Sequence, residues 1–289
     1  MTALQMTPSQ AAIPDDRRTR RYAIAARVLT GLLIVVLFLL PVLYIVMVAL
    51  EPSSHFLSDP LSPPTHPVPG NFSAVWSQGD LGTELVNTVL YSVVAAALTT
   101  VLSLLIAFPI ARRLIAWSNA LYSLLVIGLF LPLSIIPLFI EARDLHLYNN
   151  QIGYILLHVE PTLPLGVVLL TGFITAIPRE LDEAAWSDGC GYLRYLVRVV
   201  APLTWSGLLI CFLYSMIGVW NDIIGPVVFL ASPSLYPISR GLYAFYSANE
   251  SEWTLLAAGI VIASLPILVL FVITQRYFIR SAMGGAIKM

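Results

Sequence analysis

The sequence predicts an all-α membrane protein with six transmembrane helices, and its composition is the first observation behind this prediction. Of the 289 residues, 58% are apolar and 11% are charged, whereas soluble domains average roughly 45–50% apolar and about 25% charged residues. The mean hydropathy is +0.85. So large an apolar surface does not fit into one water-soluble core. Lipid is therefore the expected solvent for most of the chain.

The second observation is the length of the apolar segments. A bilayer core about 30 Å thick requires roughly 20 helical residues, and six segments meet this requirement. Prolines interrupt several of them, which we interpret as packing kinks, because neighbouring helices satisfy the freed carbonyls. The first segment is expected to remain as a span, since its apolar run is too long for a signal peptide. The predicted spans are residues 28–50, 85–111, 114–140, 151–177, 203–224 and 253–275.

The third observation is the distribution of basic residues, which sets the orientation. If residues 1–27 lie in the cytoplasm, 13 of the 15 basic residues are cytoplasmic and only Arg143 and Arg240 lie outside. Cytoplasmic loops are enriched in Lys and Arg, so both termini and the loop 178–202 are predicted to be cytoplasmic. Residues 1–27 then form a basic cytoplasmic segment, with contact to anionic lipids as a secondary role. Residues 28–289 form one transmembrane domain.

The composition also argues against several classes of function. The single lysine, Lys288, is followed only by Met289, whereas a nucleotide-binding P-loop needs Gly-Lys followed by Ser or Thr. The chain is therefore not expected to be an ATPase. The net charge of −1 gives no indication of a nucleic-acid partner. The histidines of the outer loops predict no metal site.

The stretch ELDEAAWSDG, residues 180–189, holds four of the chain's 16 acidic residues. Pro178 is favoured in the first turn of a helix, and acidic residues near that end interact favourably with the helix dipole. Glu180 and Glu183 are three residues apart and share a helix face. Gly189 predicts a left-handed residue that ends the helix. These residues fit either a solvated loop whose acids cap a helix, or a rigid knob that enters a groove on another protein.

The loop also contains Glu183-Ala184-Ala185, Gly189 and Pro202 at a spacing that resembles a known motif. It resembles the EAA loop of permease subunits of binding-protein-dependent ABC importers, with Val199 in place of Ile and Ala201 in place of Leu. Three further segments resemble the carbohydrate branch of that family, of the maltose-permease type. These segments are Asn87-Thr88, Trp220-Asn221-Asp222 with Pro226, and Gln275-Arg276-Tyr277-Phe278 followed by Gly285-Ala286-Ile287-Lys288.

The resemblance implies that the loop forms a coupling helix that docks into a cleft of a separate ATPase subunit. Glu183 is then expected to pair with a basic residue of the ATPase, the two alanines to allow close approach, and Gly189 to set the turn. ATP and Mg²⁺ are expected on the partner ATPase subunits, and no cofactor on this chain. The residues assigned to coupling are Glu180, Glu183, Ala184, Ala185, Asp188 and Gly189.

The resemblance also implies a set of partners in a prokaryotic cytoplasmic (inner) membrane. They are a second homologous permease, two ATPase subunits, an extracytoplasmic solute-binding protein or lipoprotein, a sugar substrate and the lipid bilayer. The predicted outer loops 51–84 and 231–252 are candidates for contact with the binding protein.

Polar groups inside the predicted spans are candidates for the substrate pathway, because an ionisable group in a bilayer is functional by default. Glu160 is expected near the membrane centre, about 14 Å from the start of its helix at 1.5 Å per residue. The alternative is that Glu160 pairs with His158 or a neighbouring helix for structure. Trp220 and Asn221 are interpreted as packing and gating elements more than as direct ligands. The candidate residues are His158, Glu160, Tyr214, Trp220, Asn221 and Asp222.

Other functions stay open at this point. An ABC importer permease for a polyol phosphate or a polyamine has the same coupling loop. A proton-coupled secondary transporter would use Glu160, but such folds often contain inverted repeats, and none is visible. An intramembrane enzyme would need His158 with Glu160, or Asp222, as catalytic groups, and the sequence lacks a HExxH motif or a Ser/His/Asp set.

Overall fold

The computed structural model describes residues 16–131, 134–246 and 252–286, and in these ranges the chain forms helices and no strands. This confirms the predicted all-α class. The long helices are α1 (Asp16–Ala49), α4 (Leu81–Arg112), α7 (Gln151–Thr175), α11 (Trp205–Trp220) and α14 (Trp253–Ala286). The shorter elements are α2 (Ser53–Ser58), α3 (Gly70–Gln78), α5 (Ser118–Gly128), α6 (Ile135–Asp144), α8 (Glu180–Ser187), α9 (Tyr192–Tyr195), η1 (Leu196–Val200), α10 (Ala201–Leu203), α12 (Ile224–Phe229), η2 (Pro233–Leu235), α13 (Ile238–Leu242) and η3 (Tyr243–Phe245).

Four of the described helices are long and apolar enough to cross a membrane by themselves. They lie where the first, second, fourth and sixth spans are predicted: Tyr22–Ala49, Leu81–Arg112, Gln151–Thr175 and Trp253–Gln275. A fifth candidate is the pair Tyr192–Leu203 and Trp205–Trp220, which is bent by 84°. The prolines that were interpreted as kinks stay inside continuous helices in several spans, at Pro41, Pro109, Pro161, Pro164 and Pro266.

The predicted third span, residues 114–140, is not one helix. It contains α5, with 11 residues, and the start of α6, with 10 residues, so each is about half the length of roughly 20 residues that a bilayer needs. Pro137 lies in the first turn of α6, where its missing N–H removes no helical bond, whereas it would break a helix that ran through it. The sequence did not reveal this break, because the residues on both sides of it are apolar. By length and composition the described residues therefore supply four or five spanning helices, and the exact count of six stays a prediction.

The centre of the molecule is formed by α4, α7 and α11, which pack closely through small and hydroxyl-bearing residues. Thr99 on α4, Thr162 on α7 and Ser215 on α11 form a triangle of hydroxyl contacts, with oxygens 3.1–3.4 Å apart. A Cβ atom added at Gly166 of α7 would lie 2.2 Å from the Ser103 hydroxyl of α4. Small residues and hydroxyls of this kind let membrane helices approach and bond to one another.

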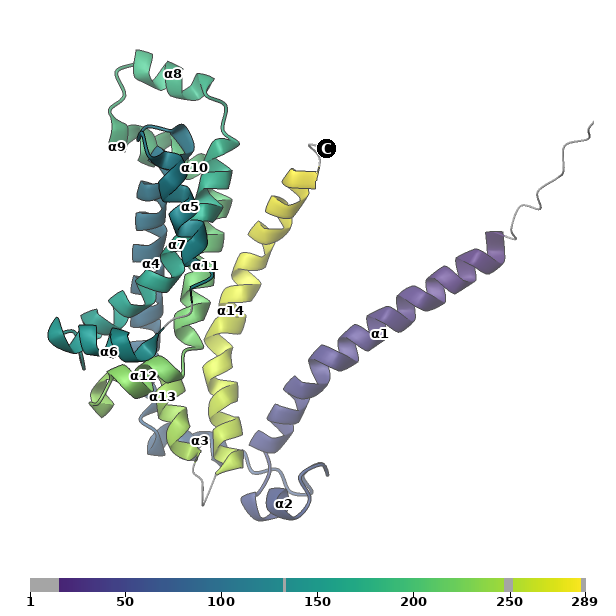
Figure 1. Ribbon diagram of the computed structural model, residues 1–289. Coiled ribbons are helices and arrows are strands. Elements are labelled where there is room, and N and C mark those ends of the chain that lie inside the picture. The colour runs from purple at the N-terminus through teal and green to yellow at the C-terminus, as the bar shows by residue number, and fades with distance from the viewer. Residues whose placement is uncertain (1–15, 132–133, 247–251, 287–289) are drawn as a thin grey trace, which may run out of the picture.

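The two ends of the bundle differ in structure. Figure 1 places α8 at one end, toward which the first residues of α1 and the last of α14 also point. The short helices α2, α3, α6, α12 and α13 lie toward the opposite end. The predicted topology requires this separation, because it puts the loop 178–202 and both termini on one side. Which end faces the cytoplasm stays a prediction.

The segment 51–84, predicted as an outer loop, contains α2, α3 and the start of α4. Glu51 is fully buried, and its carboxylate lies 2.5 Å from Nδ1 of His55. The Asn71 amide donates to the carbonyl oxygens of Ala49 and Glu51, both at 3.0 Å. These contacts fold the segment back onto the end of α1, and they pair His55 with Glu51.

Candidate functional site

The acidic stretch forms the helix α8, which projects from the end of the bundle (Figure 1). Glu180, Asp182 and Glu183 occupy its first turn, where the helix dipole favours negative charge. Of the residues assigned to coupling, Glu180, Glu183, Ala184, Asp188 and Gly189 are exposed, whereas Ala185 is half-buried against the core of the bundle. The solvent-facing side of α8 is therefore acidic and small at its centre.

Two apolar side chains border this acidic face and were not predicted as functional. Leu181 is 41% exposed and Trp186 is 55% exposed. Trp186 also lines a small cavity with Arg112 and Asp182. A large exposed indole on a charged helix is the signal that could have identified it, because tryptophan is enriched where proteins contact partners.

The C-terminal end of α8 has the predicted geometry. Gly189 has a φ of +68°, a left-handed conformation that is costly for other L-residues. Its N–H donates to the Trp186 carbonyl at 3.0 Å, and the Cys190 N–H donates to the Ala185 carbonyl at 2.9 Å. These two bonds form a Schellman motif, which satisfies carbonyls that the helix end leaves free. The direction in which the chain leaves α8 is therefore set by one glycine.

The inner side of α8 is held by Asp182, which sequence reasoning did not select. Arg112, the last residue of α4, binds its carboxylate with two nitrogens: Nε lies 2.8 Å from Oδ2, and Nη2 donates to Oδ1 at 3.0 Å. Arg112 Nη1 also donates to the Ile177 carbonyl at 3.1 Å. The Tyr195 hydroxyl of α9 donates to Asp182 Oδ1. The side chains of Arg112 and Asp182 are only 6% and 15% exposed.

This contact, which we call the Asp182 anchor (Asp182, Arg112 and Tyr195), joins α8 to two other elements. It links the acidic helix to the end of α4 and to the start of the segment that leads into α11. Tyr195 and the next residue, Leu196, are themselves buried in the core, at 2% and 1% exposure. A displacement of α8 must therefore move these elements with it or break a largely buried, hydrogen-bonded ion pair.

The link from α8 to α11 is less direct than the sequence suggested. The sequence predicts a fifth span that begins at residue 203, directly after the loop 178–202. The chain instead passes through α9, η1 and α10, and then bends by 84° before α11. The bend lies at Thr204, which is buried and whose hydroxyl donates to the Val200 carbonyl at 2.8 Å. The connection from α8 into the bundle thus consists of the segment Tyr192–Leu203 and the helix α11, which meet at an angle.

The candidate pathway residues do not form one site. Asp222 is a structural hub: its Oδ2 lies 3.2 Å from His158 Nε2 and accepts from the Tyr154 hydroxyl at 3.2 Å. Its Oδ1 accepts from the Gly225 N–H at 2.9 Å. Asp222 and His158 therefore join α7 to the turn that follows α11. The pairing of Glu160 with His158 that was considered as an alternative is wrong, since His158 pairs with Asp222.

Glu160 and Tyr214 lie at the same cavity, apart from the contacts of Asp222. Both line a cavity of about 800 Å³ between the α5–α6 segment, α7 and α11, and Glu141 lines it too. Glu160 and Tyr214 are both exposed. Within the described part of the chain, the Glu160 carboxylate makes no hydrogen bond or ion pair. The lining of the cavity contains acids but no Lys, Arg or His.

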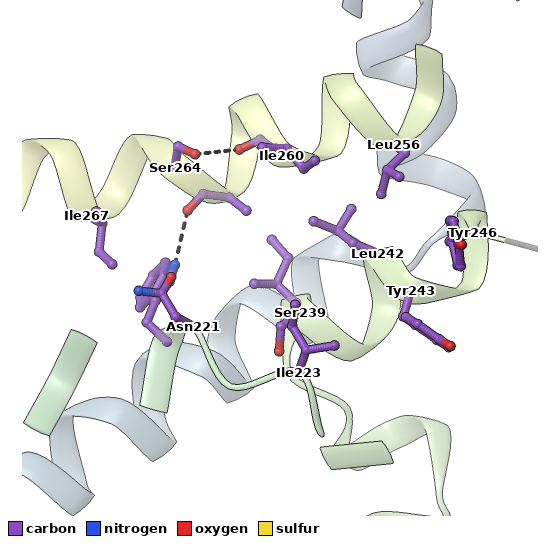
Figure 2. Close-up of a pocket in the computed structure, with 13 residues that line it drawn as sticks. Asn221, Ile223, Ser239, Leu242, Tyr243, Tyr246, Leu256, Ile260, Ser264 and Ile267 are labelled. Atoms are coloured by element: carbon purple, nitrogen blue, oxygen red, sulfur yellow. Dashed lines mark hydrogen bonds between the residues drawn. The ribbon is translucent and has the colours of Figure 1, made fainter. Parts of the chain in front are cut away.

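Trp220 and Asn221 lie at a different cavity, of about 380 Å³, between the end of α11, α13 and α14 (Figure 2). Trp220 is only 5% exposed, and its indole N–H donates to the Ala263 carbonyl of α14 at 3.2 Å. This placement favours the packing interpretation of Trp220. In Figure 2 Asn221 and Ser239 stand across the cavity from Ile260 and Ser264 of α14.

Asn87 and Thr88, which resembled a family segment, also have defined contacts. The Asn87 amide donates to the carbonyls of Ser234 and Tyr236, at 2.9 and 3.1 Å. The Thr88 hydroxyl accepts from the Ile238 N–H at 2.8 Å. Both residues therefore fasten the segment after α12 onto α4, which is a structural role.

Comparison with known proteins places this geometry in a family. The family model of the binding-protein-dependent transport system inner membrane component matches residues 100–283. The melibiose/raffinose/stachyose import permease protein MelC of Bacillus subtilis is 32% identical over 221 residues, which cover 75% of this chain and 80% of that protein. The diacetylchitobiose uptake system permease protein NgcG of Streptomyces coelicolor is 27% identical over 284 residues, covering 97% of this chain and 93% of that protein.

A solved structure shows the same fold. It belongs to a bacterial ABC transporter involved in the import of the acidic polysaccharide alginate, and it matches with a TM-score of 0.80 at 22% identity, covering 91% of this chain and 98% of that one. The predicted resemblance is thereby confirmed. The family match over more than half of the sequence shows that the chain belongs to the inner-membrane components of binding-protein-dependent transport systems, as a multi-pass permease subunit of an ABC transporter.

Proposed function

We propose that this chain is the permease of an ATP-driven sugar importer, and that α8 is the helix that docks into a separate ATPase subunit. The observation that carries the proposal is the construction of α8. Its acidic face is exposed, its end is fixed by Gly189, and its inner side is tied to α4 and α9 through Asp182. A helix that is anchored to the bundle on one side and exposed on the other suits a contact that transmits force.

ATP and Mg²⁺ would act on the partner subunits, and this chain would respond mechanically. Closure of two ATPase subunits on ATP displaces the clefts that hold the coupling helices. Only a partner that contacts α8 differently in its two states shifts the equilibrium of the permease. Displacement of α8 would pass through the Asp182 anchor to α4 and α9, and across the bend at Thr204 to α11.

The helix α1 supports the proposal of a second permease. Its apolar side chains are mostly exposed in this single chain, with Val28 at 65% and Leu43 at 57%. Figure 1 shows α1 leaning away from the bundle, so lipid and a neighbouring permease would cover its length. Apolar surface of this size on a membrane protein marks contact with lipid or with another helix.

A sugar as the solute is supported by the relatives named above and by the cavity of Glu160 and Tyr214. Carboxylates accept hydrogen bonds from hydroxyl groups, and the tyrosine ring provides an apolar face. Because acids line this cavity without a basic residue, its charge favours a neutral or cationic solute over a polyol phosphate. Among the non-sugar alternatives, a polyamine fits this charge best.

Copurification tests the proposal directly. A tagged chain, expressed with its neighbouring genes and extracted in mild detergent, is expected to retain an ATPase subunit and a second permease at fixed stoichiometry. Glu183→Lys is expected to lose the ATPase but keep the second permease, because it reverses the charge of the docking face. Arg194→Gln, an exposed change outside α8, serves as the control. Solute uptake by the purified chain alone, driven by a proton gradient, would establish the secondary transporter instead.

The role of Glu160 yields a second expectation. Replacing it by Gln keeps the shape and removes the charge, and hydrogen bonds to charged groups are worth about 1.5–3 kcal/mol. In Glu160→Gln, the solute concentration that gives half-maximal uptake by the intact importer should therefore rise roughly tenfold or more, since about 1.4 kcal/mol is a factor of ten. Asp144→Asn, an exposed acid outside the cavity, should leave uptake unchanged. An unaltered affinity and rate in Glu160→Gln would remove Glu160 from the solute pathway.

A further inference from the structure

A second acidic cavity lies at the end of the bundle opposite α8, between the two segments predicted as outer loops. Its volume is about 560 Å³, within the range of roughly 300–1,000 Å³ that is typical of ligand sites. One wall is the junction of α3 and α4, with Asp80 and Glu84, and the other is the segment of α13 and η3, with Arg240. Glu252, just before α14, completes the set of charged residues.

Glu84 is the unusual residue of this cavity. It is only 7% exposed, and its Oε2 atom has no hydrogen-bond partner among the described residues. A Cβ atom added at Gly241 of α13 would lie 1.8 Å from that oxygen. The carboxylate therefore rests on the backbone of α13, in space that only a glycine leaves open. Burying a carboxylate without a partner is costly, so this arrangement points to a cationic group that is supplied from outside.

The neighbouring charges do not neutralise Glu84. Arg240 lies over the rings of Tyr236 and Tyr243, with its guanidinium carbon 4.9 and 5.8 Å from the two ring centres. Within the described ranges, no ion pair of 4.0 Å or less joins Arg240 to Glu84, Asp80 or Glu252. Among the residues that the structure describes, three carboxylates therefore line the cavity with one guanidinium, which is stacked on aromatic rings.

The geometry is unsuited to a metal ion. Among the residues that the structure describes, no three His, Cys, Asp or Glu side chains are grouped closely enough to hold one. A single basic side chain needs less, because one buried carboxylate and an acidic rim satisfy it. The elements that line the cavity belong to the end of the molecule where α3 and α13 lie (Figure 1).

We infer that this cavity receives a lysine or arginine side chain of the extracytoplasmic binding protein. The inference rests on the proposed function, which supplies such a partner and places this end of the bundle outside the cytoplasm. Pairing would satisfy Glu84 only in the docked state, so the contact contributes to affinity and fixes the register of docking. The acidic rim of Asp80 and Glu252 would attract the basic side chain during approach.

Binding measurements test this inference. The importer is purified with its ATPase in lipid nanodiscs, and the binding protein encoded beside it is titrated at low and at physiological salt. Truncating one partner of a buried charge pair costs about 2–5 kcal/mol, so Glu84→Gln should weaken docking at least tenfold and flatten its salt dependence. Gly241→Ala, which pushes the carboxylate from its seat, should act in the same direction. Asp144→Asn, an exposed acid of α6, is the matched control.

A double-mutant cycle identifies the contact. Each lysine and arginine on the binding protein's docking face is changed to Gln, alone and together with Glu84→Gln. Strong non-additivity with one basic residue establishes the pair. Equal docking by Glu84→Gln and the unaltered importer, or additivity with every basic residue, overturns the inference. ATPase copurification is measured on the same samples, so a change in docking at constant copurification concerns the cavity and not the proposed function.

Discussion

Asp182→Asn is expected to abolish solute uptake while the importer still assembles and hydrolyses ATP. The substitution keeps the size of the side chain and removes the charge that Arg112 binds with two nitrogens at 2.8 and 3.0 Å. Breaking a buried pair by removing one partner is destabilising by about 3–5 kcal/mol, because the other charge is left uncompensated. Since Asp182 is 15% exposed, the lower part of that range applies. The loss is large enough to detach α8 from α4.

The measurement compares two rates in proteoliposomes, ATP hydrolysis and solute accumulation. A detached α8 still occupies the ATPase cleft, so hydrolysis should continue at a rate near that of the unaltered importer, with accumulation lost. Tyr195→Phe removes only one hydroxyl from the same contact and should reduce the coupling ratio partially. Arg194→Gln, one residue away and exposed, is the control. Parallel loss of hydrolysis and uptake in Asp182→Asn would show that Asp182 serves assembly and not coupling.

The Asp182 anchor also shows where reasoning from the sequence ends. Helical spacing and the dipole placed Glu180 and Glu183 correctly on an exposed face, because both properties are local. Asp182 and Arg112 are 70 residues apart in the chain, and no local pattern distinguishes this acid from its neighbours. Arg112 was counted only as a topological charge. Its position as the last residue of a span facing the loop that holds α8 was the available signal.

The spans illustrate the same distinction. Hydropathy predicted the positions of α4, α7 and α14, since a long apolar run that must satisfy its own backbone has only the helix available. It missed the break between α5 and α6, because lipid-like composition continues across it. The His158–Asp222 pair was missed for the reason given for Asp182: it joins residues of two separate elements.

The candidate pathway residues differ between prediction and structure for a related reason. The sequence placed six polar residues in one candidate pathway because all lie in or near the fourth and fifth spans. The structure separates them by helix face: Glu160 and Tyr214 face one cavity, Trp220 and Asn221 another, and His158 pairs with Asp222. Sequence distance along a helix does not determine which side of the bundle a side chain reaches. The proposal of a solute site therefore concerns Glu160 and Tyr214 together, and not all six residues.

A graded series at Gly189 is the second large effect, because the backbone there is left-handed. A Cβ atom at this position would meet nothing within 4 Å, so the cost of a substitution arises from φ alone, at +68°. That cost is roughly 1–2 kcal/mol for most L-residues and is greatest for β-branched ones, while Asn tolerates the conformation. Uptake should therefore decrease in the order Gly, Asn, Ala, Val.

Gly189→Val is expected to abolish uptake, since the Schellman bonds of Gly189 and Cys190 can form only if the strained conformation is kept. Without them α8 loses its fixed end, and the acidic face no longer meets the ATPase at one angle. Gly191→Ala is the matched control, because Gly191 has a φ of −68° and also has open space around its Cβ position. Uptake rates of the series, with ATPase copurification as the check on docking, distinguish the two outcomes. Equal uptake by Gly189→Val and Gly189→Asn would contradict this prediction. It would show that transport does not require the left-handed conformation that fixes the end of α8.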